Sequence, residues 1–143
     1  MEGKLITVST NNFKLIGEFV TNLGRSRDTF RYFDKRDFNV FKNHIITYLY
    51  IKDNKPVGYG HLDKDDDTVW LGVAVLPGYY KMGIGNLIVQ ELLKVARKEQ
   101  LNEVFLTVDN YNKKAIELYN KVGFKVVENF NSSKISKFKL DLN

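Results

Sequence analysis

The amino-acid sequence predicts an α/β domain of the mixed α+β kind, in which helices flank a central mixed, mostly antiparallel sheet. The 143 residues are 43% hydrophobic and 27% charged, which suits one soluble globular domain and is too short for two. β-rich segments joined by short turns fill the middle of the chain, and segments with helical apolar spacing occur on either side of them. We therefore expect a single domain over residues 1–143 with the element order βααβββαβαββ.

The N-terminal part contains a short strand and an amphipathic helix. Residues 5–8 read as the strand, and apolar side chains recur at three- and four-residue steps over residues 11–23. Thr10 or Asn11 is the expected N-cap of this helix, and Gly24 is expected to end it.

The following region is first irregular and then β-rich. Residues 25–43 mix aromatic and charged side chains, which predicts a loop with a short helix near residues 37–42. Three strands come next, joined by polar turns and ended by Pro77; they cover residues 45–51, 57–62 and 68–76, with turns at 53–55 and 63–67. Because these turns are short, the three strands are expected to be antiparallel neighbours.

The C-terminal half alternates helices with strands. Residues 84–98 form the strongest predicted helix, with Lys94, Arg97 and Lys98 in the last turns, where the helix dipole favours cations. The remaining predicted elements are a strand over 104–108, a helix over 112–122 closed by Gly123, and strands over 124–127 and 135–142.

Composition excludes several kinds of site. The chain has no cysteine, which excludes disulfides and thiolate nucleophiles, and His44 and His61 are too few for a histidine-rich metal site. The run Asp65–Asp67 lacks the glycine and distal glutamate of a calcium loop, so no metal is expected there. No apolar run is long enough to span a membrane, and the N-terminus does not read as a signal peptide, which predicts a cytoplasmic protein.

The charge indicates a small anionic ligand. Lys and Arg number 22 against 17 Asp and Glu, so the net charge is +5. The basic residues are spread along the chain with no run of five or more, which favours a localised anion site over a nucleic-acid groove. We expect neither nucleic acid nor a membrane as a partner.

A glycine-containing loop between a strand and the strongest helix is the first candidate site. Gly83 and Gly85 lack a Cβ, so a ligand can approach their backbone, and the helix N-terminus beside them offers free N–H groups and the positive end of the dipole. Such a place binds pyrophosphate, and Lys81 adds a positive charge. The loop matches neither a dinucleotide-binding fingerprint nor a P-loop, and two glycines alone are more often a tight strand–helix turn.

A second motif, one strand later, decides between these interpretations. It reads Asn112-x-x-Ala115-x-x-x-Tyr119-x-x-x-Gly123-Phe124, and the earlier motif reads Val75-x-Pro77 followed by Gly83-x-Gly85. In this order and spacing the two motifs resemble the Gcn5-related N-acetyltransferase (GNAT) superfamily, and the resemblance covers the whole chain in element order. Two departures are visible: Tyr80 replaces the usual Arg or Gln of the loop, and residues 69–72 lack the Glu base that some members have.

The resemblance implies acetyl-CoA as the co-substrate. The backbone of Val73, Ala74 and Val75 would bind the pantetheine arm as an added strand, and an N–H of this strand would stabilise the thioester oxygen. The loop and first helical turn would bind the pyrophosphate; these residues are Lys81, Met82, Gly83, Ile84, Gly85 and Asn86. Asn112 matches an Asn that hydrogen-bonds the cofactor, and it also suits a helix N-cap.

Two residues are the catalytic candidates, Tyr119 and His61. Tyr119 matches the family Tyr that protonates the leaving thiolate, although its place on an apolar stripe also suits core packing. The attacking amine must be neutral, and His61 is the first candidate for the base, with Asp63 and a water chain as alternatives. Tyr59, His61 and Asp63 share one face of a strand, so Asp63 could orient His61 or bind an ammonium itself. His44, at a strand start, is expected to be structural.

The acceptor is expected beside the loop over residues 25–35. Arg31 and Tyr32 could pair with a phosphate or stack on a ring, although such aromatics also pack against a core. The leading hypothesis is an N-acetyltransferase that acetylates a primary amine of a small molecule, an amino sugar among the candidates, by direct attack in a ternary complex. The alternatives are a protein or peptide N-acetyltransferase and a non-catalytic CoA-binding sensor or interaction module. The acceptor, the physiological acyl group and the oligomeric state, monomer or homodimer, stay open.

Overall fold

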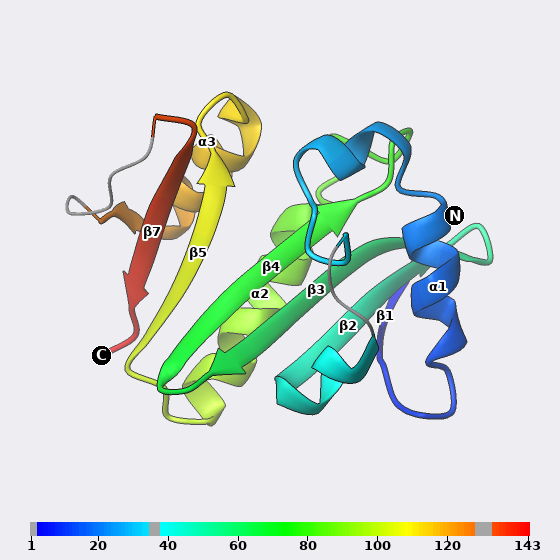
Figure 1. The fold of residues 1–143 in the computed structure, drawn as a ribbon, viewed down its shortest axis with the longest axis horizontal. Helices are drawn as coiled ribbons and strands as arrows, with labels where there is room; N and C mark the ends of the chain where they lie inside the picture. The colour runs from blue at the N-terminus through cyan, green and yellow to red at the C-terminus, as the bar shows by residue number, and fades with distance from the viewer. Residues whose placement is uncertain (1–2, 35–37, 128–132) are drawn as a thin grey trace.

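A computed structural model describes residues 3–34, 38–127 and 133–143. Within these residues seven strands form one sheet in the order β1-β2-β3-β4-β5-β7-β6, antiparallel except between β4 and β5 (Figure 1). The strands are β1 (Lys4–Thr7), β2 (His44–Lys52), β3 (Lys55–Asp65), β4 (Thr68–Val75), β5 (Glu103–Asp109), β6 (Lys125–Val126) and β7 (Ile135–Asp141). The helices are α1 (Lys14–Thr21), α2 (Ile84–Lys98) and α3 (Lys113–Val122), with 3₁₀ helices η1 (Gly24–Asp28) and η2 (Phe38–Asn43). The predicted fold class is confirmed.

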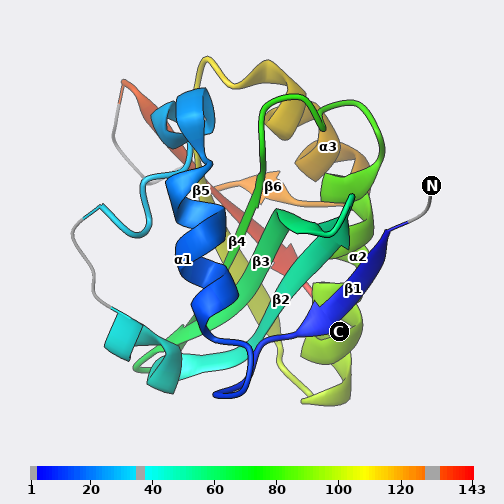
Figure 2. The ribbon, with the colours of Figure 1, turned by 90° about the vertical axis from the view of Figure 1, so that its right-hand side faces the viewer.

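Helices cover both faces of the sheet. Figure 2 shows α1 on one face and α2 with α3 on the other. On the first face, Phe19 of α1 stacks on Tyr59 of β3 with ring centroids 5.7 Å apart. On the second face, α2 lies directly on the backbone of β3, so that a Cβ at Gly58 would lie 2.8 Å from Ile84 and 2.9 Å from Ile88. The β3 sequence therefore needs glycine where α2 crosses it.

The first face is covered over only part of its width. In Figure 1, α1 and η1 lie in front of β1 to β4, and no described helix lies in front of β5 and β7. On this open part the rings of Trp70 and Phe105 lie 5.7 Å apart, and Lys137 Nζ lies 4.6 Å from the Phe105 ring centroid. Half-buried aromatic and basic side chains therefore lie on a part of the sheet that no described helix covers.

The start of α1 differs from the prediction. The helix begins at Lys14 after Phe13, which makes no side-chain capping bond, so the expected Thr10 or Asn11 cap is wrong. Turns occupy the preceding residues, because the Asn12 side chain accepts from Ser9 N–H at 2.8 Å and holds the chain in a different local structure.

Strand β3 is longer than predicted. It continues to Asp65, and the turn shrinks to Asp66 and Asp67, with Asp66 at a φ of 55°. Asp63 therefore lies within the strand, opposite Trp70 of β4 and His44 of β2. This extra length brings Asp63 into the sheet beside the site described below.

The last elements are close to the predicted ones. The range of α2 is confirmed, and Gly123 closes α3 with a φ of 118° and an N–H bond to Tyr119 O. Phe124 N–H also bonds to Tyr119 O, at 2.9 Å, so this residue belongs to the helix end and β6 is shorter than expected. Across the described ranges, no helix is both long and apolar enough to cross a bilayer.

Candidate functional site

A cleft of about 950 Å³ lies where β4 and β5 separate. The two parallel strands pair at one position, Trp70 with Phe105, and diverge beyond it (Figure 1). The cleft takes in the end of β4, the N-termini of α2 and α3, and the segment after α1. Every predicted site residue except Met82 lines it; these are Arg31, Tyr32, His61, Asp63, Val73, Ala74, Val75, Lys81, Gly83, Ile84, Gly85, Asn86, Asn112 and Tyr119.

The end of β4 directs backbone groups into the cleft. Leu76 N–H donates to Val57 O of β3 at 2.8 Å. Directly opposite residues of an antiparallel pair exchange hydrogen bonds at every second position, so the N–H and C=O groups of Val73 and Val75 point away from β3 and toward β5. Because β5 has already diverged at this level, an extended ligand with amide groups can pair with Val73 as an added strand.

Tyr80 contributes a structural contact at this edge. The Ser26 hydroxyl donates to Val75 O at 2.8 Å and is hydrogen-bonded to the Tyr80 hydroxyl. The Arg25 guanidinium lies over the Tyr80 ring, 5.4 Å from its centroid. The residue that departs from the family pattern therefore ties the loop to η1.

The N-terminus of α2 forms an open cradle. Gly83 is the N-cap residue of α2 with a φ of 80°, a conformation that favours glycine, and no atom lies within 4 Å of the place where its Cβ would be. Lys81, also at positive φ, is exposed beside it. Free helix N–H groups, a positive dipole end and open space fit a pyrophosphate group. In the described part of the chain no three His, Asp or Glu side chains gather as metal ligands.

Tyr119 and Asn112 place side chains of α3 against the cleft. Tyr119 is 7% exposed and packs edge to face on Phe124, with ring centroids 5.7 Å apart, so its core-packing role is confirmed. Burial raises the pKa of its hydroxyl, which keeps the proton in place. No described residue hydrogen-bonds this hydroxyl, so it is available to a ligand. Asn112 caps α3, because its Oδ1 accepts from Ala115 N–H at 3.3 Å; its cofactor contact stays a prediction.

A hydrogen-bonded cluster joins β2 and β3 to the segment after η1 at one side of the cleft. The Tyr32 hydroxyl donates to Asp63 Oδ2 at 2.7 Å and lies 2.8 Å from His44 Nε2. The Tyr59 hydroxyl lies 2.7 Å from His61 Nδ1. Burial lowers the pKa of His44 to about 4, so this ring is neutral at physiological pH.

Sequence reasoning gave two residues of this region, His44 and Gly72, no part in the site. His44 was expected to be structural alone, and Gly72 had no assigned role. A Cβ at Gly72 would lie 2.5 Å from His61 Nε2, so the imidazole rests directly on the β4 backbone. The pairing of His44 with Asp63 and of His61 with Gly72 follows from strand register, which depends on where the β2–β3 and β3–β4 turns fall.

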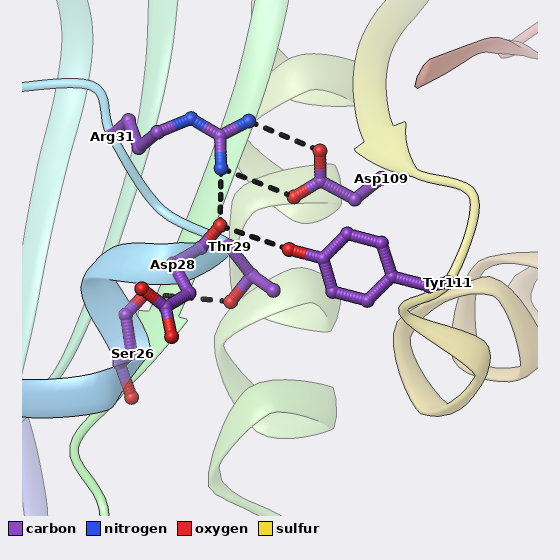
Figure 3. Close-up of polar contacts among 6 residues, drawn as sticks. All are labelled: Ser26, Asp28, Thr29, Arg31, Asp109 and Tyr111. Carbon is purple, nitrogen blue, oxygen red and sulfur yellow. Dashed lines mark hydrogen bonds and ion pairs between the residues drawn. The ribbon is translucent and has the colours of Figure 1, made fainter. Parts of the chain in front are cut away.

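A clasp of polar contacts joins the segment after η1 to the end of β5 (Figure 3). The Arg31 guanidinium donates to both carboxylate oxygens of Asp109, at 3.0 and 3.4 Å, and also to the carbonyl oxygen of Asp28. The Tyr111 hydroxyl donates to the same Asp28 carbonyl at 3.2 Å. Asp109 raises the pKa of Arg31 through these hydrogen bonds and its charge. Arg31 therefore already has an anionic partner.

Comparison with known protein families identifies one family whose sequence model matches this chain. A model of the acetyltransferase (GNAT) family matches residues 15–124, which is most of the chain. An N-alpha-acetyltransferase of Sulfurisphaera tokodaii is 45% identical over 60 residues, which are 41% of this chain and 35% of that relative. The matched stretch thus spans about a third of the curated relative.

Solved structures have the same fold at low identity. The PaiA N-acetyltransferase of Thermoplasma acidophilum, in complex with coenzyme A, matches with a TM-score of 0.74 and 15% identity, over 99% of each chain. The Salmonella typhimurium protein yncA, with its cofactor acetyl-CoA, matches with a TM-score of 0.78 and 15% identity, over 100% of this chain and 95% of that one. At this identity the similarity concerns the fold.

Proposed function

The chain belongs to the acetyltransferase (GNAT) family, and from this premise we propose that it is an acetyl-CoA-dependent N-acetyltransferase whose acceptor is a primary amine. One observation supports this most strongly: the backbone of Val73, beyond the one position where the described strands β4 and β5 pair, opens into the same cleft as the Gly83 cradle. The strand edge suits the amide groups of pantetheine, and the cradle suits the pyrophosphate.

In the proposed reaction the acceptor attacks the thioester directly. The neutral amine nitrogen forms a C–N bond to the carbonyl carbon, the C–S bond breaks, and the amine loses one proton to water. The leaving thiolate gains one proton from the Tyr119 hydroxyl, which water then reprotonates. A backbone N–H of β4 would stabilise the negative charge on the carbonyl oxygen. Tyr119 is a candidate for this role because its hydroxyl faces the cleft and, since burial raises its pKa, still has its proton when the thiolate forms.

The acceptor site is proposed on the side of the cleft that contains Tyr32, His61 and Asp63. We keep a small-molecule amine as the first candidate, with amino sugars and polyamines as representatives. A peptide α-amine is the second candidate, supported by the local similarity to an N-alpha-acetyltransferase. The part of the sheet at Trp70, Phe105 and Lys137, which no described helix covers, also favours it, because a peptide needs room beyond its first residue.

Thermal unfolding and thiol release test this proposal together. Acetyl-CoA and CoA should each stabilise the protein, by about 2.7 kcal/mol at a hundredfold excess over Kd, whereas acetate should not. Thiol release should then appear with at least one amine from a panel of amino sugars, polyamines, amino acids and short peptides. Stabilisation without thiol release from any amine would favour the CoA-binding sensor, and no stabilisation at millimolar acetyl-CoA would refute the assignment.

A further inference from the structure

The cluster beside the acceptor side of the cleft contains two separate hydrogen-bond arrangements. One consists of Thr47, His44, Tyr32 and Asp63, and the other of Tyr59 and His61. Both end on β3, where His61 and Asp63 line the cleft two residues apart on the same face. The direction of each hydrogen bond decides which of these two groups can receive a cationic amine.

The first arrangement has one consistent direction. An ionised carboxylate only accepts, so the Tyr32 hydroxyl gives its single proton to Asp63 and must accept from His44 Nε2. A neutral His44 with its proton on Nε2 has an acceptor on Nδ1, which takes the Thr47 hydroxyl proton at 2.8 Å. The donors therefore run from Thr47 through His44 and Tyr32 to Asp63, which holds the carboxylate in one orientation.

The second arrangement fixes the protonation of His61. Tyr59 is completely buried, and burial raises the pKa of its hydroxyl, so the proton stays on it. Its described hydrogen-bond partner is His61 Nδ1, and a buried hydroxyl proton left without an acceptor is destabilising. Tyr59 therefore donates to Nδ1, and a neutral His61 has its proton on Nε2, the nitrogen that rests against Gly72. In this state the ring is a donor at that nitrogen and has no free basic nitrogen there.

We propose that Asp63 binds the ammonium group of the acceptor amine, with Tyr32 and His44 as residues that position it, and that His61 is a fixed wall of the acceptor site. The proposal rests on the acetyl transfer proposed above and goes beyond it, because it selects Asp63 over His61. It also gives Tyr32 a role in positioning a carboxylate instead of binding an acceptor phosphate. The substrate class that it names is an amine that is cationic when it binds and that gives one proton to water before its neutral nitrogen attacks the thioester.

Steady-state kinetics, with the amine and acetyl-CoA each varied in turn, test the roles of Asp63 and His61. Asp63→Asn should raise the KM of the amine roughly 10- to 100-fold, the scale of a charged hydrogen bond, and leave the KM of acetyl-CoA unchanged. His61→Gln, which retains a donor, should keep the pH profile of kcat/KM. An unchanged amine KM in Asp63→Asn would overturn the proposal. It would also be overturned if kcat/KM no longer fell at low pH in His61→Gln alone, because that result would identify His61 as the base.

Matched variants of Tyr32 and His44 test whether these residues position Asp63. Tyr32→Phe removes the proton given to Asp63 and should raise the amine KM several-fold with a smaller change in kcat. His44→Gln retains an N–H donor near the position of Nε2, whereas His44→Leu does not, so Gln should restore most of the affinity that Leu loses. Equal amine KM values for the folded Gln and Leu variants would overturn the role of His44.

Imidazole ¹⁵N NMR of the whole protein gives a measurement that does not depend on activity. At neutral pH both histidines should be protonated on Nε2, and Tyr59→Phe should remove this preference from His61 alone. A proton on His61 Nδ1 would overturn the proposal even if acetyl transfer is observed. If instead neither CoA binding nor acetyl transfer is found, the proposed function fails, and the tautomer measurement still decides the hydrogen-bond directions.

Discussion

On the proposed cofactor side of the cleft, the groups expected to contact a ligand are mostly backbone groups within residues 73–86, whereas on the proposed acceptor side they are side chains from separate parts of the chain. The second set comes from residues 28–32, His61, Asp63 and Asp109, and His44 and Thr47 are connected to it through the hydrogen bond of His44 to Tyr32. A binding site made of backbone groups requires little of the side chains, except that some positions must lack a Cβ. Such a site can keep one ligand while the side chains on the acceptor side change. The difference suggests that cofactor binding and acceptor binding can be separated by mutation.

The largest expected effect concerns Tyr119, a side chain on the side where backbone groups predominate. Tyr119→Phe should lower kcat about 10- to 1000-fold, the scale of one general acid, because a proton donor to the thiolate is lost. The KM of acetyl-CoA should change little, since this interaction forms late in the reaction. Packing on Phe124 is retained, so the free energy of unfolding should change by no more than about 1 kcal/mol.

Tyr48→Phe is the matched control, because Tyr48 lies on β2 outside the cleft lining and loses the same hydroxyl. It should retain the kcat of the parent protein. Full kcat in Tyr119→Phe with a genuine acceptor would assign this residue to the core and the acid to water.

The next effect concerns the cradle at Gly83. Gly83→Val should weaken CoA binding roughly 100-fold, because the branched side chain enters the open space before the helix N-terminus and two charged hydrogen bonds are lost. Gly78→Val is matched for backbone strain, since Gly78 also has a positive φ and open space but does not line the cleft. Calorimetry should show loss of binding in the first variant alone. Equal affinities would show that Gly83 serves only the turn.

The fold was predictable because its signals are local. The apolar stripe over residues 84–98, the glycine that closes α3 and the short turns of the central strands each depend on neighbours in sequence. The start of α1 could not be predicted, because the Asn12 side chain stabilises a turn instead of capping the helix. The length of β3 could not be predicted either. Asp63 resembles a turn residue in the sequence, and its pairing with Trp70 determines that it lies within the strand.

The candidate site divides in the same way. The Gly83 loop and the Tyr119 motif could be located from sequence, because each is local and together they resemble a known family; both line the cleft, and their roles stay predictions. The neighbours of Asp63 could not, because Tyr32 and His44 reach it through tertiary packing and the strand register of β2. From the sequence, Arg31 was proposed to bind the acceptor. Its contact with Asp109 could not be predicted, because Asp109 lies 78 positions away in the sequence.

A third prediction uses the ionisation of His44 to mark the acceptor side. The pKa of His44 is about 4 in the folded state and near 6.5 when unfolded, so between these pH values the unfolded chain binds a proton that the folded protein does not. Stability should therefore fall as the pH drops from about 6.5 to 4, by roughly 2–3 kcal/mol, and this contribution should be constant above pH 7.

Urea unfolding of the parent and of His44→Gln across this pH range isolates the contribution, because carboxylate titrations are common to both proteins. The difference in unfolding free energy between them should change in favour of the variant as the pH falls. Parallel curves would mean that folding leaves the pKa of His44 near its unfolded value, which would contradict the lowering by burial.

The smallest expected effect concerns the clasp, which lies between the two sides. The Arg31 side chain is 47% exposed, so its ion pair with Asp109 is largely screened, and Arg31→Ala should lower the free energy of unfolding by about 1 kcal/mol or less, with a smaller loss in 1 M salt. Arg31→Lys is the control: it keeps the charge but cannot reach both carboxylate oxygens and the Asp28 carbonyl in one plane, so it should be intermediate. Because the clasp holds the segment that also contains Tyr32, Arg31→Ala should raise the amine KM a few-fold and leave the acetyl-CoA KM unchanged. If the acetyl-CoA KM rises instead, the clasp supports the cofactor side, and the two sides of the cleft are mechanically coupled.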